Sequence, residues 1–308
     1  MVEELQSGVI YDTRTPDKKA LDYKQEDLAS AVILDWKEKA LSEWKKNAPR
    51  YQNGSLSCVA QSCAKAFEIL GMSIESAHPI YRSRSNFPSG GMFPQDAGSI
   101  CKNIGTTRED LDKSQWQNEQ TMNRDITCPT PDKVGGYVFT DPHNIESIAG
   151  LIATYGQCLL LIRCNKNEWT AIPEYKGDAI DFHHEICAVD YFLKDGVKYI
   201  LCEDSTGHFN SFDKNGQRLL GEDFIKARCD NAMSLLPLPP KPILTFTRNL
   251  KIGCVGVDVK QLQLRLNIGA DGLFGKKTRT AVISFQIKNQ LQPDGVVGKL
   301  TINKLNNL

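Results

Sequence analysis

The segment QNGSLSCVAQSCAKAFEIL, residues 52–70, joins a polar turn to an amphipathic stretch. Apolar side chains recur at helical spacing after Cys58 and predict a helix that stops at Gly71; they are Val59, Cys63, Ala66, Phe67 and Leu70. A thiol at the start of a helix lies at the positive end of the helix dipole, which favours the thiolate. Cys58 is therefore a candidate nucleophile, although cysteine is more commonly a small buried apolar residue.

Gln52 precedes this cysteine by six residues, across a turn that contains Gly54. Its side chain can fold back and place an amide N–H beside the sulfur. Together with the backbone N–H of Cys58, that amide would form an oxyanion hole, the pair of donors that stabilises a tetrahedral intermediate.

Two later runs supply a base and an acid. HHEICAVDY (183–191) and YILCED (199–204) are strand-like and are separated by a Lys-Asp-Gly turn, which predicts a hairpin. Such a hairpin brings Asp204 close to a histidine ring, so a nucleophile, a base and an orienting acid are all available. Asp204 can also be read as a simple turn residue at a strand end. Adjacent histidines on a strand point to opposite faces, so His183 and His184 are poor joint metal ligands, and no metal or cofactor is expected.

The order of elements predicts an α+β fold. Helical patterns at 58–70 and 144–155 precede short apolar strands at 158–164, 186–193 and 197–203. The segment LLPLPPKPILTFTR (235–248) then holds four prolines and is typical of a stiff spacer. We therefore predict a first domain at 1–236, a proline-rich linker at 237–248 and a second domain at 249–308.

The second domain contains a near-repeat. DGLFGKKT (271–278) and DGVVGKLT (294–301) share the pattern D-G-x-x-G-K-x-T, and each predicts an Asp-Gly turn that leads into a helix capped near its threonine. Apolar stripes around the first copy complete a predicted three-helix unit of about 60 residues, near the lower limit for independent folding. A phosphate-binding loop is excluded, because the spacing does not match G-x-x-x-x-G-K-[ST].

Composition limits the partners. Lys plus Arg and Asp plus Glu both total 37, so the formal net charge is zero and no nucleic-acid partner is expected. No apolar run is long enough to span a bilayer, and the N-terminus is acidic where a secretory signal would be basic and then apolar, so neither a membrane partner nor a signal peptide is expected. The ten cysteines are scattered without a C-x-x-C pair, which favours buried free thiols over a zinc site or a disulfide framework.

Taken in order, the motifs of residues 30–236 resemble those of papain-like cysteine peptidases. The matching features are Gln52 and Cys58 at the family's spacing, Gly90-Gly91 followed by Pro94 and Ala97, His184 followed by Ala188-Val189-Asp190-Tyr191, and Tyr199-Ile200-Leu201 leading to Asp204-Ser205-Thr206-Gly207. The resemblance implies a helical lobe and an antiparallel β lobe, with Cys58 as nucleophile and His184 as base. It further implies that Asp204 orients the ring, Gln52 stabilises the oxyanion and the backbone of Gly90 and Gly91 pairs with substrate. Because one base suffices, His183 is given a hydrogen-bonding or structural role and is counted among the substrate-binding residues.

Several positions depart from the family pattern. Asp204 replaces the usual asparagine, Val59 the tryptophan after the nucleophile, and Thr206 the tryptophan that shields the triad. The cysteines of the common disulfide would fall at Ser55 and Pro88, and only 57 residues precede Cys58, too few for the family's long propeptide. These departures bear on substrate preference and catalytic strength more than on fold.

The second domain resembles a three-helix peptidoglycan-binding module. The matching features are Leu250-Lys251-Ile252-Gly253, Val259, Leu262-Gln263, Asp271 to Gly275, Thr278, Ala281-Val282, Phe285-Gln286 and Asp294 to Gly298, whereas Gln290 replaces a usual glycine. Taken singly, most of these positions also fit ordinary core and turn residues.

The combined resemblance implies a monomeric cysteine endopeptidase directed at peptidoglycan or cell-wall peptides, with the module raising the local enzyme concentration. A bacteriophage endolysin or virion-associated enzyme, made in the cytoplasm and acting at the wall, is the expected setting. Two alternatives remain: a catalytically inactive papain-fold protein that binds the wall, and a protein-processing protease that is merely tethered there.

Overall fold

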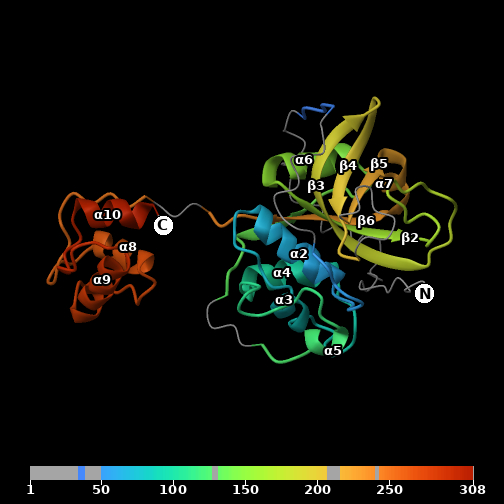
Figure 1. Cartoon of the computed structure of the whole chain (residues 1–308). Coiled ribbons are helices and arrows are strands. Elements are labelled where there is room, and N and C mark those ends of the chain that lie inside the picture. Colours follow the sequence, from blue (N-terminus) through green and yellow to red (C-terminus); the bar gives the residue numbers. More distant parts are fainter. Residues whose placement is uncertain (1–33, 39–49, 127–130, 207–215, 240–242, 308) are drawn as a thin grey trace. The chain divides into compact units, whose positions relative to one another are not determined.

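The computed structural model of this chain describes residues 34–38, 50–126, 131–206, 216–239 and 243–307 (Figure 1). The chain divides into two compact units, Met1–Leu238 and Pro239–Leu308. This division falls inside the proline-rich segment 235–248. Each unit has its own hydrophobic core.

An antiparallel sheet forms the centre of the first unit. Within the described residues it has six strands in the order β1-β6-β2-β3-β4-β5. They are β1 (Gly136–Phe139), β2 (Cys158–Cys164), β3 (Phe182–Lys194), β4 (Val197–Glu203), β5 (Gln217–Gly221) and β6 (Cys229–Leu236). The predicted hairpin joins β3 to β4, where Asp195 and Gly196 take positive φ angles of 53° and 76° that suit a tight two-residue turn. The three predicted strands are confirmed, and β3 begins early enough to carry both histidines.

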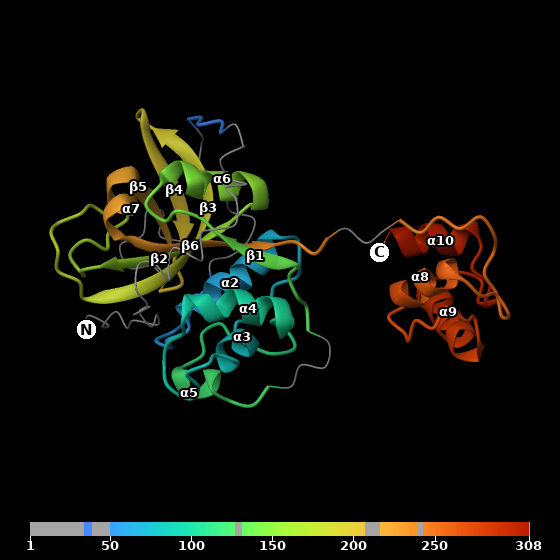
Figure 2. The ribbon, with the colours of Figure 1, turned by 180° about the vertical axis from the view of Figure 1, so that it is seen from behind.

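Helices cover both faces of this sheet. In both views α3, α4 and α5 lie on one side of it and α6 and α7 on the other (Figure 1, Figure 2). The helices are α2 (Cys58–Ile69), α3 (His78–Arg82), α4 (Pro94–Asn103), α5 (Glu119–Met122), α6 (Ile145–Tyr155) and α7 (Glu222–Arg228). Strand β2 shows why its sequence is continuously apolar: Leu159 and Leu161 join the core around α2, whereas Leu160 and Ile162 join the core around α6 and α7. The α+β prediction is confirmed.

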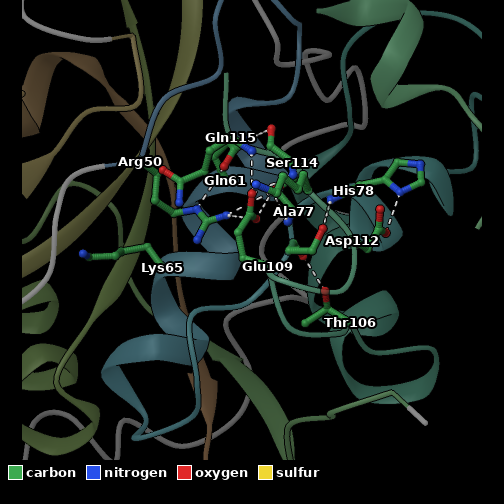
Figure 3. A network of polar contacts seen from close by, with 12 residues as sticks. Arg50, Gln61, Lys65, Ala77, His78, Thr106, Glu109, Asp112, Ser114 and Gln115 are labelled. Carbon is green, nitrogen blue, oxygen red and sulfur yellow. Dashed lines mark hydrogen bonds and ion pairs between the residues drawn. The ribbon is translucent and has the colours of Figure 1, made fainter. Parts of the chain in front are cut away.

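Helix α2 runs through the interior, and every residue from Cys58 to Glu68 is buried. The helix stop predicted at Gly71 is confirmed, since this glycine takes a left-handed φ of 87° just past the end of α2. Buried polar groups on such a helix need partners. Arg50 provides one, because its Nε donates to Gln61 Oε1 over 2.9 Å (Figure 3). Its guanidinium also pairs with Glu68.

This polar network ties α2 to both segments that carry the candidate acid and amide. Arg50 lies two residues before Gln52, and its Nη2 also pairs with Glu109 Oε2 over 3.2 Å (Figure 3). On the same face of the helix, Lys65 Nζ lies 3.5 Å from Glu68 Oε2 and 2.9 Å from Glu203 Oε2, and Glu203 immediately precedes Asp204. The network therefore positions the segments around Cys58 relative to one another.

The second unit holds three helices in its described part, α8 (Val257–Arg265), α9 (Lys276–Lys288) and α10 (Lys299–Asn306), as predicted. Their apolar stripes meet in one core; its buried members are Leu244, Leu250, Val259, Leu262, Phe274, Val282, Val297 and Leu305. None of the helices in the described ranges of either unit is long and apolar enough to cross a membrane.

The near-repeat corresponds to two identical polar locks, spaced 23 residues apart. Gln263 Oε1 accepts from Gly272 N over 2.8 Å, and its Nε2 lies 2.7 Å from Asp271 Oδ1. Gln286 Oε1 accepts from Gly295 N over 2.9 Å, and its Nε2 lies 2.9 Å from Asp294 Oδ1. In each copy, the same Nε2 reaches the threonine hydroxyl, at 3.0 Å and 3.3 Å.

The predicted threonine caps are wrong. The N-cap residues of α9 and α10 are Gly275 and Gly298, and the threonines lie inside the first turn, three residues later. Thr278 and Thr301 face the glutamine of the preceding helix, so they join two helices instead of ending one. The repeat therefore encodes contacts between successive helices.

Candidate active site

The structure brings Cys58 and His184 together from different elements. Cys58 is the first residue of α2 and is fully buried, and His184 lies on β3 with 1% of its surface exposed. The ring Nε2 lies 2.7 Å from Asp204 Oδ1, whereas Nδ1 is buried and has no partner at regular hydrogen-bond geometry among the described residues. Burial lowers the pKa of His184, but the charge and hydrogen bond of Asp204, together with the Cys58 thiol, raise it to about 10. The imidazolium form is thus stabilised next to the thiol.

Asp204 sits directly after β4 and is almost fully buried. Its Oδ1 accepts from His184 and from the backbone N–H and hydroxyl of Thr206, at 2.9 Å and 2.7 Å. Its Oδ2 accepts from Trp169 Nε1 over 3.1 Å and from Arg218 Nε over 2.6 Å. Burial alone would raise the pKa of this carboxyl, but the positive charges of Arg218 and His184 hold it well below its usual range. Asp204 therefore stays ionised.

Gln52 is held against the segment that follows Asp204 by two hydrogen bonds. Its backbone N–H donates to Ser205 O over 3.0 Å, and its Oε1 accepts from Ser205 Oγ over 2.7 Å. Its Nε2 donates to Ser55 O over 2.9 Å. An amide nitrogen carries two hydrogens, and Ser55 uses one of them. The side chain is thus fixed by Ser205, the residue that follows Asp204. The second hydrogen on Gln52 Nε2 can still be donated to another acceptor.

Comparison with solved structures relates this first unit to known folds. Xylellain, a cysteine protease from Xylella fastidiosa, superposes with a TM-score of 0.59 over 76% of this chain and 97% of its own, at 13% identity. Digestive procathepsin L2 from Tenebrio molitor larval midgut gives a TM-score of 0.58 over 75% and 78% of the two chains, at 15% identity. The proform of the ragweed pollen cysteine protease Amb a 11 gives 0.55 over 70% of each chain, at 15% identity.

The first unit has the papain-like fold. In the second unit, residues 255–305 match the family described as "Putative peptidoglycan binding domain". Among curated proteins, none matches the sequence.

An indole from another part of the chain covers the His184 ring. Thr206 stands where the resemblance described above would place a tryptophan. Trp169, from the segment between β2 and β3, is 3% exposed and meets the His184 ring edge-on, at 5.8 Å between centroids and 86° between planes. The indole also donates to Asp204, so it both covers the imidazole and holds the acid. Sequence reasoning missed it, because a single tryptophan in a polar loop carries no local pattern.

Gly90 and Gly91 lie between α3 and α4. A side chain at Gly90 would place its Cβ 2.4 Å from Leu56 Cδ1, so Leu56 packs directly against this backbone. The Gly91 N–H donates to Tyr81 Oη over 3.0 Å, and the carbonyls of both glycines accept from Asn86 Nδ2 over 3.3 Å and 3.1 Å. The Gly91 N–H therefore has an internal partner, and pairing of both glycines with substrate stays a prediction.

A polar bridge centred on Glu119 lies beside the turn that precedes Cys58. Glu119 Oε2 accepts from the backbone N–H of Leu56 over 2.8 Å, and Glu119 Oε1 accepts from Tyr81 Oη over 2.6 Å. Tyr81 in turn accepts from Gly91 N–H. Leu56 is next to Ser55, one of the two positions where the absent cysteines would fall. The bridge thus joins the nucleophile turn to the glycine segment without a covalent bond.

We expect Glu119→Ala to raise KM for a peptide substrate about tenfold with a smaller effect on kcat. The substitution removes the acceptor of two buried donors, and a hydrogen bond to a charged group contributes about 1.5–3 kcal/mol, where 1.4 kcal/mol is tenfold in binding. Steady-state kinetics on one short peptide measure both parameters. Tyr81→Phe breaks the same bridge between Glu119 and Gly91, so KM should rise in this variant as well. Equal KM values for Glu119→Ala and the parent would show that the bridge does not position the glycine segment for substrate.

His183 has different charged neighbours from His184, the ring that lies beside Cys58. It is half-buried on β3 opposite Arg163 of β2. Burial and Arg163 lower the pKa of His183, although Asp230 opposes them by raising it. The register selects His184 as the ring beside Asp204, as predicted, and a substrate contact by His183 stays a prediction.

The other cysteines are set apart from Cys58 by their surroundings. All nine cysteines in the described ranges are free thiols, and Cys128 lies outside those ranges. A hydrogen bond with Cys101, together with burial, raises the pKa of Cys63 well above its usual value, and burial does the same for Cys187. Among the described residues, no group of three potential ligands could hold a metal ion.

Arg218 is the second residue that sequence reasoning missed. It lies on β5 in the strand sequence QRLLG and is fully buried. An arginine is rarely buried without a charged partner, so a basic residue inside an apolar strand is a signal for a buried acid. That signal does not say which acid, and only the β4–β5 pairing brings Arg218 next to the segment of Asp204.

Proposed function

We propose that this chain is a cysteine endopeptidase that cleaves peptides of the bacterial cell wall. The observation that carries the proposal is the buried Cys58–His184–Asp204 arrangement at the start of α2, in the same chain as a peptidoglycan-binding module. The fold alone would allow many activities, because function depends on the site and not on the fold.

The geometry supports the following reaction. The Cys58 thiolate attacks the carbonyl carbon of the scissile bond, and Gln52 Nε2 donates to the oxygen that becomes negative. His184 holds the proton and gives it to the leaving amine as the C–N bond breaks. Water, deprotonated by His184, then hydrolyses the thioester and releases Cys58. Asp204 orients the ring through Nε2 and leaves Nδ1 facing the thiol.

In this proposal the second unit holds the enzyme at the cell wall and takes no part in the reaction. A second binding site on the wall polymer raises the effective concentration of the first unit on its substrate. We therefore propose peptidoglycan stem peptides as the substrate, and a bacteriophage lysin or virion-associated enzyme as the biological setting.

One observation favours a second candidate, a papain-fold protein that binds the wall without cleaving it. Cys58 has 0% of its surface exposed, and an attacking sulfur must be reached by the scissile carbonyl. The polar arrangement around His184 argues against this candidate, because a protein that needs no imidazolium gains nothing from burying one.

Digestion of purified sacculi separates these possibilities. The parent and Cys58→Ser proteins are incubated with sacculi, and the soluble products are analysed by mass spectrometry. New amino termini within stem peptides, released by the parent alone, are the expected result. Co-sedimentation without any soluble fragment indicates the binding protein. Release of wall proteins, with intact muropeptides, indicates a tethered protein-processing protease.

A further inference from the structure

Arg218 is a large cationic side chain that is entirely removed from solvent, and its contacts converge on the site. Its Nε donates to Asp204 Oδ2 over 2.6 Å, and its Nη1 donates to Thr170 O over 2.8 Å. The guanidinium carbon lies 4.4 Å from the centre of the Trp169 ring. Arg218 thus makes a cation–π contact with Trp169, the same indole that covers His184.

We propose that Arg218 is a positioning residue that neutralises Asp204, so that the Asp204–Arg218 pair acts as one neutral unit behind His184. The inference rests on the proposed cysteine-nucleophile function and deepens it. The two carboxylate oxygens of Asp204 have separate partners. Oδ2 accepts hydrogen bonds from Arg218 and Trp169. This orients Oδ1 toward His184 and Thr206. The family that this chain resembles has a neutral asparagine at the position of Asp204. In this chain, Asp204 is charged, but Arg218 supplies the opposite charge, so the pair is neutral as well.

The charges at the site then sum to zero. A Cys58 thiolate and a His184 imidazolium cancel, and Asp204 and Arg218 cancel. Without Arg218 the buried group would carry one net negative charge, and without Asp204 one net positive charge. In a low-dielectric interior either imbalance shifts the neighbouring titrations, because charges there interact far more strongly than in water.

Other titratable groups that face these residues keep a constant state or titrate alike in every variant. Cys164 on β2 and Cys202 on β4 sense Asp204 and Arg218, and burial raises the pKa of both thiols far enough to keep them neutral. Glu185 on β3 senses His184, and burial raises the pKa of its carboxyl to about 8. Because Glu185 is present in all variants, its titration does not distinguish them.

The charge argument predicts opposite shifts in two single variants. In Arg218→Met the pH at which the Cys58 thiolate forms should rise by about one unit, because the unbalanced Asp204 charge disfavours a second anion. In Asp204→Asn it should fall by about one unit, because an unbalanced Arg218 favours the anion. In the double variant Asp204→Asn/Arg218→Met it should return close to the parent value. A purely structural role for Arg218 would not produce shifts that cancel.

The experiment measures the rate of Cys58 alkylation by iodoacetamide against pH in the full chain, with kcat/KM on a peptide as a second readout. The double variant should be at least about tenfold more active than Asp204→Asn, since removing one partner of a buried pair is worse than replacing both. Arg218→Lys keeps the charge but not the planar fork. It should keep the parent pH midpoint, with lower kcat/KM, and it tests the inference even if Arg218→Met does not fold.

Two outcomes would overturn the inference. A parent-like midpoint in Arg218→Met, with a double variant no better than Asp204→Asn, shows that Arg218 is only structural, and a midpoint in Arg218→Lys that shifts although the charge is kept contradicts the charge argument. Absence of any reactive thiolate at Cys58 in the parent rejects the proposed nucleophile, and this inference with it. The alkylation readout needs no wall substrate, so a wrong substrate assignment leaves the test of Arg218 intact.

Discussion

Cys58→Ala is expected to abolish peptide hydrolysis, lowering kcat/KM by about 10⁴-fold or more, because the variant lacks the only atom that forms the covalent intermediate. The protein should stay folded, since alanine suits a buried helical position and the polar contacts of Gln52 and Asp204 do not involve the sulfur. Binding to sacculi should be unchanged. Kinetics on a short peptide and co-sedimentation with sacculi measure the two properties.

The matched control is Cys63→Ala, on the same helix. This thiol is equally buried, but its surroundings raise its pKa and keep it protonated, so the variant should retain activity. An epoxide that reacts with activated thiols should label Cys58 and none of the other nine cysteines. Labelling at another cysteine, together with full activity of Cys58→Ala, would reject the assignment of the nucleophile.

Removing the second unit should separate wall retention from chemistry. A chain that ends at Leu238 is expected to hydrolyse a short soluble peptide at the parent rate, because every contact described around Cys58 comes from the first unit. Its activity on intact sacculi should fall by about 10²-fold or more, since linked binding sites raise avidity by 10² to 10⁴. Release of soluble fragments per unit time measures the loss.

The reciprocal experiment uses residues 239–308 alone. They should co-sediment with sacculi, and Gln286→Leu should weaken both folding and retention by removing the lock on Gly295 and Asp294. The exposed Leu264→Ala is the matched surface control and should preserve folding. If the parent fragment folds but stays in the supernatant, the module does not bind the wall.

Much of the site was predictable because its signals are local. The start of α2 at Cys58, the stop at Gly71 and the hairpin at Asp195-Gly196 each follow from a few consecutive residues. The register that places His184 beside Asp204 does not follow from the hairpin alone, because an irregularity between Ala188 and Asp190 shifts the β3–β4 pairing by one residue and so decides which histidine faces the acid. The aspartates and threonines of the second unit were also visible as a repeat, although the pattern did not show that the threonines join helices instead of capping them.

The sequence by itself determined the α+β class, the candidate nucleophile, base and acid, and the three helices of the second unit, because backbone periodicity and turn chemistry act over short distances along the chain. Only the tertiary structure decided what surrounds the acid. Arg218, Trp169 and Asp204 come from separate elements, and β-sheet pairing and core packing bring them within hydrogen-bond distance. The Glu119 bridge likewise joins residues about 60 positions apart. Such contacts depend on how the fold brings distant segments together, and the spacing of residues along a short stretch of sequence does not encode them.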